Sequence, residues 1–167
     1  MDFNMPEITK CFGTFPPKYA TYLISIFGMG SGGVGLAGII LYGLIENSIL
    51  GEYINSGNID ESVRKAFLLT IGLTSLLLTI GNVILFLGVT STSRGTIGTG
   101  VMVIFVMCMC IIMAVIGAPL SCFFVSEACI ISKMSLVTIV LGILVITVFL
   151  EIWLYFMIVA HNYANQI

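Results

Sequence analysis

Charged residues are scarce in this sequence, at 8% of its 167 residues, and it contains a single histidine. A soluble domain carries about 25% charged residues, so this chain has too few to cover a water-exposed surface. With 59% hydrophobic residues and a mean hydropathy of +1.16, the chain is not a disordered protein either. Six basic against eight acidic residues give a net charge of −2, which excludes a nucleic-acid-binding protein. What remains is an integral membrane protein.

The sequence contains four long apolar runs. Three of them contain no charged residue, and the fourth contains only Glu151. A membrane-spanning helix needs about 20 mostly apolar residues. Pro119 is expected to kink the third span or to mark its end. The sequence therefore predicts an all-α fold, an integral membrane four-helix bundle with short loops, whose domain at 19–160 holds spans at about 20–45, 66–90, 100–125 and 134–160.

Both ends of the chain are expected in the cytosol. Residues 1–18 form a polar N-terminal segment without the apolar stretch of a cleavable signal peptide, and 161–167 form a short cytosolic tail. An even number of spans puts both ends on one side of the membrane. The basic residues that set orientation divide equally between the two sides, but the loop at 46–65 is mainly acidic, which favours its placement outside the cytosol.

The first apolar run is rich in glycine. Its sequence from Gly28 to Gly33 matches the phosphate-binding pattern G-x-G-x-x-G, but a dinucleotide site needs that pattern between a strand and a helix. Inside an apolar span, small residues four apart instead let two helices pack backbone to backbone. The alternative is a local break in this helix, which is a feature of transporters. We expect helix packing through the pairs Gly28/Gly32, Ser31/Gly35 and Gly33/Ala37.

Glu151 is the only charge inside a span, and a charge at mid-membrane costs about 2.5–3.5 kcal/mol unless it finds a partner, a proton or water. Counted from the cytosolic ends of the spans, one residue of each span falls in the same layer: Gly28, Asn82, Cys108 and Glu151. We expect an intramembrane polar layer in which Asn82 donates a hydrogen bond to Glu151. Two alternatives are that Glu151 reaches the headgroups beside Trp153 as an interface anchor, and that it serves an ion or proton pathway.

The five cysteines form no metal-ligand pattern, and with a single histidine we expect no metal site, no cofactor and no catalytic group of residues. Cys122 and Cys129 flank the third connection, which faces the oxidising side in this topology, so they are candidates for a disulfide. Cys11, just before the first span, is a candidate for palmitoylation. For each the alternative is a free thiol, and Cys108 is expected to be a small packing residue.

Two stretches carry a resemblance to a known family. The entry at 10–15 leads into a glycine-rich span, and the aromatic-rich closing run at 151–163 leads into a short tail that begins near Tyr163. In these features and in its layout of spans, the chain resembles insect four-span membrane proteins of the pasiflora type and, more distantly, the lysosome-associated four-span (LAPTM) proteins. The resemblance implies a non-enzymatic protein with cytosolic ends at septate junctions of the plasma membrane. An endolysosomal membrane is less expected, because Ile167 stands four residues after Tyr163 instead of the three of a sorting signal.

These observations together predict a structural or interaction component of a membrane complex, not an enzyme. Its expected partners are membrane lipids and other membrane proteins, including further copies of itself as a homo-oligomer, and no nucleic acid. Glycine faces and a methionine-rich third span suit lateral contacts between helices. The alternative function is a small transporter or channel-forming subunit that uses Glu151 and a glycine-broken first helix.

Overall fold

The computed structural model describes residues 16–46, 61–124 and 136–167 of the chain. These residues form four helices and no strand: α1 (Pro17–Glu46), α3 (Glu61–Thr90), α4 (Arg94–Phe124) and α5 (Leu136–Gln166). Each helix has 30 or 31 residues, or about 45 Å of length, which exceeds the roughly 30 Å of a bilayer's hydrocarbon core. All four contain an apolar window long enough to cross a membrane. The predicted all-α four-helix membrane bundle is confirmed.

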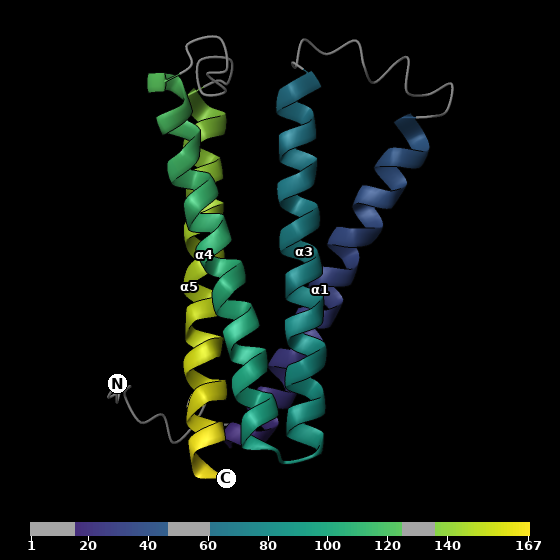
Figure 1. Ribbon diagram of the computed structural model, residues 1–167, viewed down its shortest axis with the longest axis vertical. Helices are drawn as coiled ribbons and strands as arrows, with labels where there is room; N and C mark the ends of the chain where they lie inside the picture. The colour runs from purple at the N-terminus through teal and green to yellow at the C-terminus, as the bar shows by residue number, and fades with distance from the viewer. Residues whose placement is uncertain (1–15, 47–60, 125–135) are drawn as a thin grey trace.

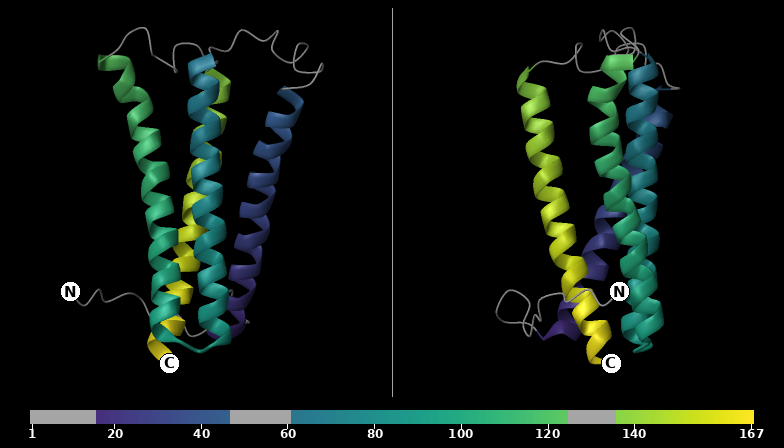
Figure 2. Two further views of the ribbon diagram at one scale, coloured as in Figure 1. Left: turned by 45° about the vertical axis from the view of Figure 1, so that its right-hand side comes forward. Right: turned by 60° about the vertical axis from the view of Figure 1, so that its left-hand side comes forward.

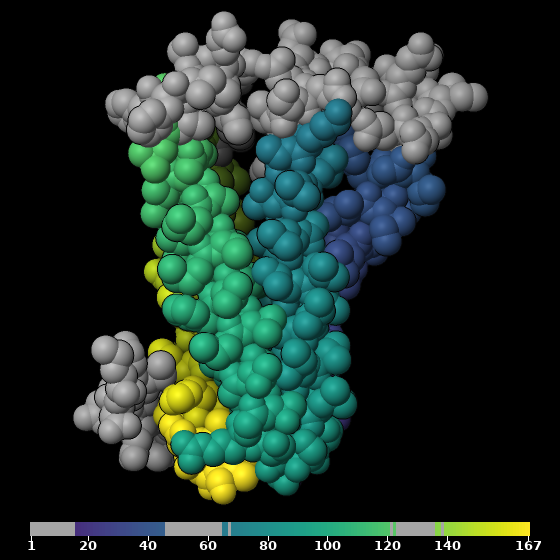
Figure 3. Space-filling model, viewed as in Figure 1, coloured from purple at the N-terminus to yellow at the C-terminus, as the bar shows by residue number. Residues whose placement is uncertain are grey.

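The four helices run alternately up and down, and each packs mainly against two others (Figure 1). α1 lies along α3, α3 lies along α4, and α5 contacts both α4 and α1, which closes the bundle. Figure 2 shows that the helices converge at the end that holds the α3–α4 turn and spread apart toward the other end. In the space-filling view α3 and α4 touch in the lower half and separate above it (Figure 3). The tightly packed half therefore lies near the start of α1 and the end of α5.

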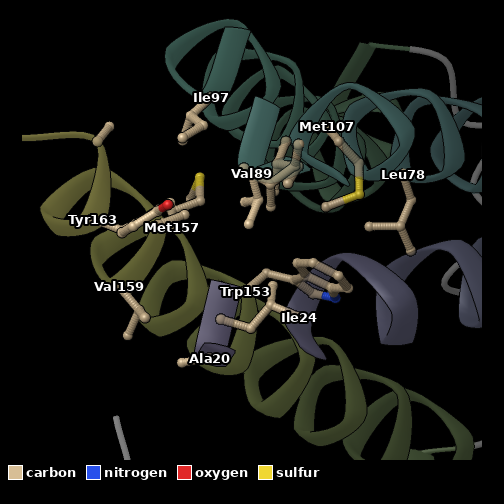
Figure 4. Packing of buried hydrophobic residues seen from close by; sticks show 14 of the residues in the cluster. Ala20, Ile24, Leu78, Val89, Ile97, Met107, Trp153, Met157, Val159 and Tyr163 are labelled. Atoms are coloured by element: carbon tan, nitrogen blue, oxygen red, sulfur yellow. The ribbon is translucent and has the colours of Figure 1, made fainter. Parts of the chain in front are cut away.

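The buried hydrophobic core occupies this converging half. Its largest wholly buried side chain is Trp153 of α5, which lies among Ile24, Leu78 and Met107 of the other three helices (Figure 4). The first half of α5, by contrast, exposes large apolar side chains on all sides, with Leu144 61% exposed. So much contiguous apolar surface is stable only against lipid or another membrane protein.

The α3–α4 connection is a tight turn with a defined hydrogen-bond pattern. The amide of Thr92 donates to the carbonyl of Val89 (3.4 Å). The amide of Ser93 donates to the carbonyl of Gly88 (3.0 Å), and together these bonds make the Schellman ending of a helix. Thr92 is left-handed, with a φ of 48°, a conformation that usually takes glycine. Ser93 then begins α4 by accepting from the amide of Ile97 (3.1 Å), so the turn holds α3 and α4 antiparallel.

The end of α5 differs from the sequence-based expectation. α5 continues through Gln166, so the residues predicted as a separate tail at 161–167 are nearly all helical. Tyr163 is buried in the core, and Arg94 of α4 donates a hydrogen bond to the side chain of Asn165 (2.9 Å). These tertiary contacts stabilise the last turns of α5, which lie beyond the apolar run that ends at residue 160.

Pro119 lies inside α4, which continues to Phe124. This residue therefore does not mark the helix end, and the expected kink stays a prediction. α1, α3 and α4 also begin a few residues before the predicted spans, because residues such as Lys18 and Lys65 continue the helix toward the headgroup region. Most of the N-terminal segment and of the longer connections lies outside the described residues.

Candidate functional site

Three of the four residues predicted to form a polar layer lie inside the bundle. Asn82 of α3 is wholly buried against Gly28 of α1, so closely that a Cβ atom on Gly28 would overlap the amide group. Cys108 of α4 is 1% exposed and belongs to the hydrophobic core. Glu151 of α5 is exposed. The layer therefore separates into a buried part and an outward-facing carboxylate.

The hydrogen bond expected between Asn82 and Glu151 is wrong. Asn82 Nδ2 donates to the backbone carbonyl of Leu78, one turn earlier in α3 (2.7 Å), and Asn82 Oδ1 is buried with no partner among the described residues. The side chain of Glu151 makes no hydrogen bond or ion pair within the part of the chain that the structure describes. The reason is rotational, because two residues of helix separate Glu151 from the core-facing Trp153, a turn of about 200° around α5.

Glu151 lies near the middle of α5, about 15 residues or roughly 22 Å from either end of the helix. The apolar run ends at Ala160, about nine residues or roughly 14 Å from Glu151, and the alternative in which this side chain reaches the headgroups stays a prediction. Trp153 is not an interface anchor, because it is 1% exposed in the core. Its ring centroid lies 5.5 to 6.5 Å from those of three aromatic neighbours, Phe27, Phe149 and Phe156.

The outer face of α5 carries a second polar residue beside Glu151. Thr147, one turn earlier, is exposed, and its Oγ1 donates to the backbone carbonyl of Ile143 (2.8 Å). Leu144 and Leu154, 61% and 44% exposed, extend the face in both directions. Between Val140 and Leu154, this outer face is apolar apart from one carboxylate and one hydroxyl.

Glycines of α1 fit against small polar residues of α3. A Cβ atom on Gly32 would lie 2.9 Å from the backbone oxygen of Ser75 and 3.0 Å from the backbone nitrogen of Thr79. A Cβ atom on Gly35 would strike the Ser75 hydroxyl. With Gly28, these glycines form one face along which α1 and α3 approach backbone to backbone.

The other residues predicted to pack the first span face elsewhere. Gly33 and Ala37 are exposed, and a Cβ atom on Gly33 would meet nothing within 4 Å. Ser31 is half-buried, and its hydroxyl donates to the backbone carbonyl of Gly28 (3.1 Å). α1 is one continuous helix through this glycine-rich stretch, so the alternative of a local break is wrong. Inside this chain, the packing face of α1 consists of the three glycines that meet α3.

A second glycine contact, between α3 and α4, was not anticipated from the sequence. A Cβ atom on Gly88 would lie 2.8 Å from the backbone nitrogen of Ile97, and one on Gly100 would lie 2.9 Å from that of Leu85. Gly81 also faces α4. Gly81 and Gly88 stand seven residues apart, a spacing that returns to the same helix face, and this is the signal that could have revealed the contact.

Among the described cysteines, two are free thiols and one is disulfide-bonded. Cys108 and Cys110 are free, whereas Cys122 near the end of α4 is disulfide-bonded. Cys11 and Cys129, the two remaining cysteines, lie outside the described residues. Cys11 is only about six residues before α1, or roughly 22 Å of extended chain, and Cys122 lies about 42 Å along α4 from the end where α1 starts. Chain length therefore favours the predicted pair Cys122 and Cys129, which stays a prediction.

The buried hydroxyl groups of α1 are hydrogen-bonded within their own helix. Thr21 and Ser25 of α1 are wholly buried, and each hydroxyl donates to a backbone carbonyl of its own helix, at 2.7 Å. In the described helices no three side chains of His, Cys, Asp or Glu gather as a metal ion would require. Glu151, by contrast, is an exposed carboxylate on the described surface of α5.

Comparison of the chain with protein-family models, with curated proteins and with solved structures gave no match.

Proposed function

We propose that this protein is a non-enzymatic, multi-pass component of a membrane complex and that it works by lateral contact with other membrane proteins. The observation that carries the proposal is the placement of Glu151, a carboxylate near the middle of the membrane-spanning helix α5 and on its outer face. Charged side chains within membrane spans almost always face a bundle interior or a water-filled cavity, where they find a partner. A carboxylate that faces out of its own bundle gains such surroundings through contact with a further chain.

The interior of the bundle supports the same proposal. Its buried hydroxyls, Thr21 and Ser25, are satisfied by the backbone of α1. Its glycines bring α1 against α3 and α3 against α4. The interior is thus built for holding the helices together, and the polar chemistry available to an external partner lies on the outer face of α5.

A small transporter or channel-forming subunit is the rival function. It would need α1 to break in the glycine-rich stretch, so that backbone carbonyls could hold a substrate, and it would need Glu151 to line the path. α1 instead runs unbroken from Pro17 to Glu46, and Glu151 is exposed on the side of α5 away from the core. Both observations support lateral contact over transport.

We further place the protein in the plasma membrane, in a junction-like complex, with both ends of the chain in the cytosol. The end of the bundle that holds the disulfide-bonded Cys122 then faces the oxidising exterior, where disulfides persist. The short α3–α4 turn lies at the opposite end, which is the cytosolic end in this orientation. The junction assignment rests on the resemblance to pasiflora-type proteins, and an endolysosomal membrane is the second choice.

Cross-linking in the native membrane, followed by detergent extraction and native mass measurement of the full chain, tests the proposal. We expect stable complexes that contain at least one further protein chain. Recovery of the cross-linked protein as a single chain, together with ion flux through vesicles that contain this protein alone, would contradict the proposal and favour transport.

A further inference from the structure

Given the proposed lateral function, the residues on the outer face of α5 indicate which chemical groups a partner must bring. Glu151 presents carboxylate oxygens, which only accept hydrogen bonds when ionised. Thr147, one turn away, has its proton committed to the carbonyl of Ile143 (2.8 Å), so its oxygen is left as a second acceptor. Two neighbouring acceptors without a donor are complementary to a group that brings several donors and a positive charge.

The described part of the chain offers no such group at this depth. Its Lys and Arg side chains lie near helix ends, at Lys18, Lys65 and Arg94. Arg94 is bonded to Asn165, about 14 residues or roughly 21 Å along α5 from Glu151. A second copy in the same orientation would bring its own Glu151 to the same depth, and this supplies a further carboxyl group but no positive charge. Charge complementarity therefore selects a different protein as the occupant.

We propose that the outer face of α5 binds a transmembrane helix of another protein that carries a lysine or arginine at mid-membrane, and that this side chain pairs with Glu151 and Thr147. Lysine has three donors and arginine five, and neither has an acceptor, which matches the two acceptors on α5.

The spacing of this face fits a helical partner. Its members are separated by four, three, four and three residues, which is the heptad spacing of two helices that pack side by side: Val140, Leu144, Thr147, Glu151 and Leu154. The apolar members are between 44% and 61% exposed and are available to pack against the partner. The apolar positions thus supply contact area, and the polar pair fixes which helix is accepted and at what depth.

Energy transfer in vesicles tests the pairing with a defined probe. The full chain, with a donor fluorophore on an N-terminal tag, is reconstituted into phosphatidylcholine vesicles. The probe is an acceptor-labelled synthetic leucine–alanine helix with one central lysine, and its control is the same helix with leucine at that position. We expect the lysine helix to associate about tenfold more tightly, which corresponds to about 1.4 kcal/mol.

Variants on the same face identify the groups responsible. Glu151→Gln should abolish the preference for the lysine helix, because the amide carries no charge. Thr147→Val should reduce the preference about threefold, the effect of one average hydrogen bond between membrane helices. Leu144→Ile is the matched control on this face and should leave the preference unchanged. The far-UV circular dichroism and the Trp153 fluorescence of each variant show that its bundle is folded.

Three results would overturn the proposal. The lysine and leucine helices could associate equally with the wild-type chain, or the lysine preference could survive in Glu151→Gln. Energy transfer between two labelled copies of this protein that is lost in Glu151→Leu would also overturn it, since the occupant would then be a second copy. The cross-linked native complexes keep the two proposals distinguishable. If the wild-type chain shows no preference for the lysine helix while the native complexes persist in Glu151→Leu, the pairing is refuted and the lateral function stands.

Discussion

Adding one methyl group to each of two neighbouring glycines of α1 should have different effects. Gly32 is buried against α3, where a Cβ atom would lie 2.9 Å from the backbone oxygen of Ser75 and 3.0 Å from the backbone nitrogen of Thr79. Gly33, the next residue, is exposed, and a Cβ atom there would meet nothing within 4 Å. Gly32→Ala and Gly33→Ala therefore make a matched pair that differs chiefly in the contact with α3.

The expected difference follows from two opposing terms. Alanine favours a helix interior over glycine by about 1 kcal/mol, and this gain is common to both variants. Overpacking costs about 1–3 kcal/mol, and here the atoms struck belong to backbone, so α1 has to move away from α3. We therefore expect Gly33→Ala to equal the wild type or exceed it by up to about 1 kcal/mol. Gly32→Ala should be about 1–3 kcal/mol less stable than Gly33→Ala.

Unfolding of the purified chain in mild detergent, by titration with sodium dodecyl sulfate, measures the difference. The buried Trp153 is the single tryptophan, so its fluorescence reports the core directly. Wild type and both variants are compared at the same detergent composition. Equal stability of Gly32→Ala and Gly33→Ala would refute the reasoning, because α1 and α3 would then not be in backbone contact at Gly32.

Three further changes test other contacts. Gly28→Ala should lower the free energy of unfolding by about 1–3 kcal/mol, and a double-mutant cycle should show a much smaller loss in an Asn82→Ala background, where the overlapping amide is gone. Thr92→Gly should raise stability by about 1 kcal/mol, because glycine adopts the left-handed conformation without strain, and an unchanged melting temperature would count against this. Arg94→Ala should cost no more than about 1.5 kcal/mol in the same unfolding titration, since its hydrogen bond to Asn165 is exposed, and a larger loss would contradict that assignment.

The membrane bundle could be predicted from the spacing of the charges, because only four runs of the sequence are apolar and long enough to cross a bilayer. The position at which α5 ends could not be predicted in this way. Its extension to Gln166 depends on the burial of Tyr163 and on the bond between Arg94 and Asn165. Such tertiary contacts join residues far apart in the chain, and counting apolar residues does not reveal them.

The relative height of Gly28 and Asn82 along the bundle could be predicted, but the direction in which Glu151 faces could not. Residue counting placed Gly28, Asn82 and Glu151 in one layer, and Gly28 and Asn82 do meet. The side of α5 that carries Glu151 depends on which of its residues face the core, and a helix that is apolar all round has no periodicity to mark that face. The same reason explains why Gly33 and Ala37, at packing spacing, lie on the open side of α1.

A spin label in place of Glu151 tests whether this position faces away from its own bundle at mid-membrane. The label is attached to Glu151→Cys in a chain whose five native cysteines are replaced by serine, in phosphatidylcholine vesicles. Leu144→Cys and Met157→Cys are the outward and inward controls. We expect collision with oxygen to be as frequent as at position 144 and collision with a water-soluble nickel complex to be rare. A label as shielded from oxygen as at position 157, or one readily reached by nickel, would contradict this expectation.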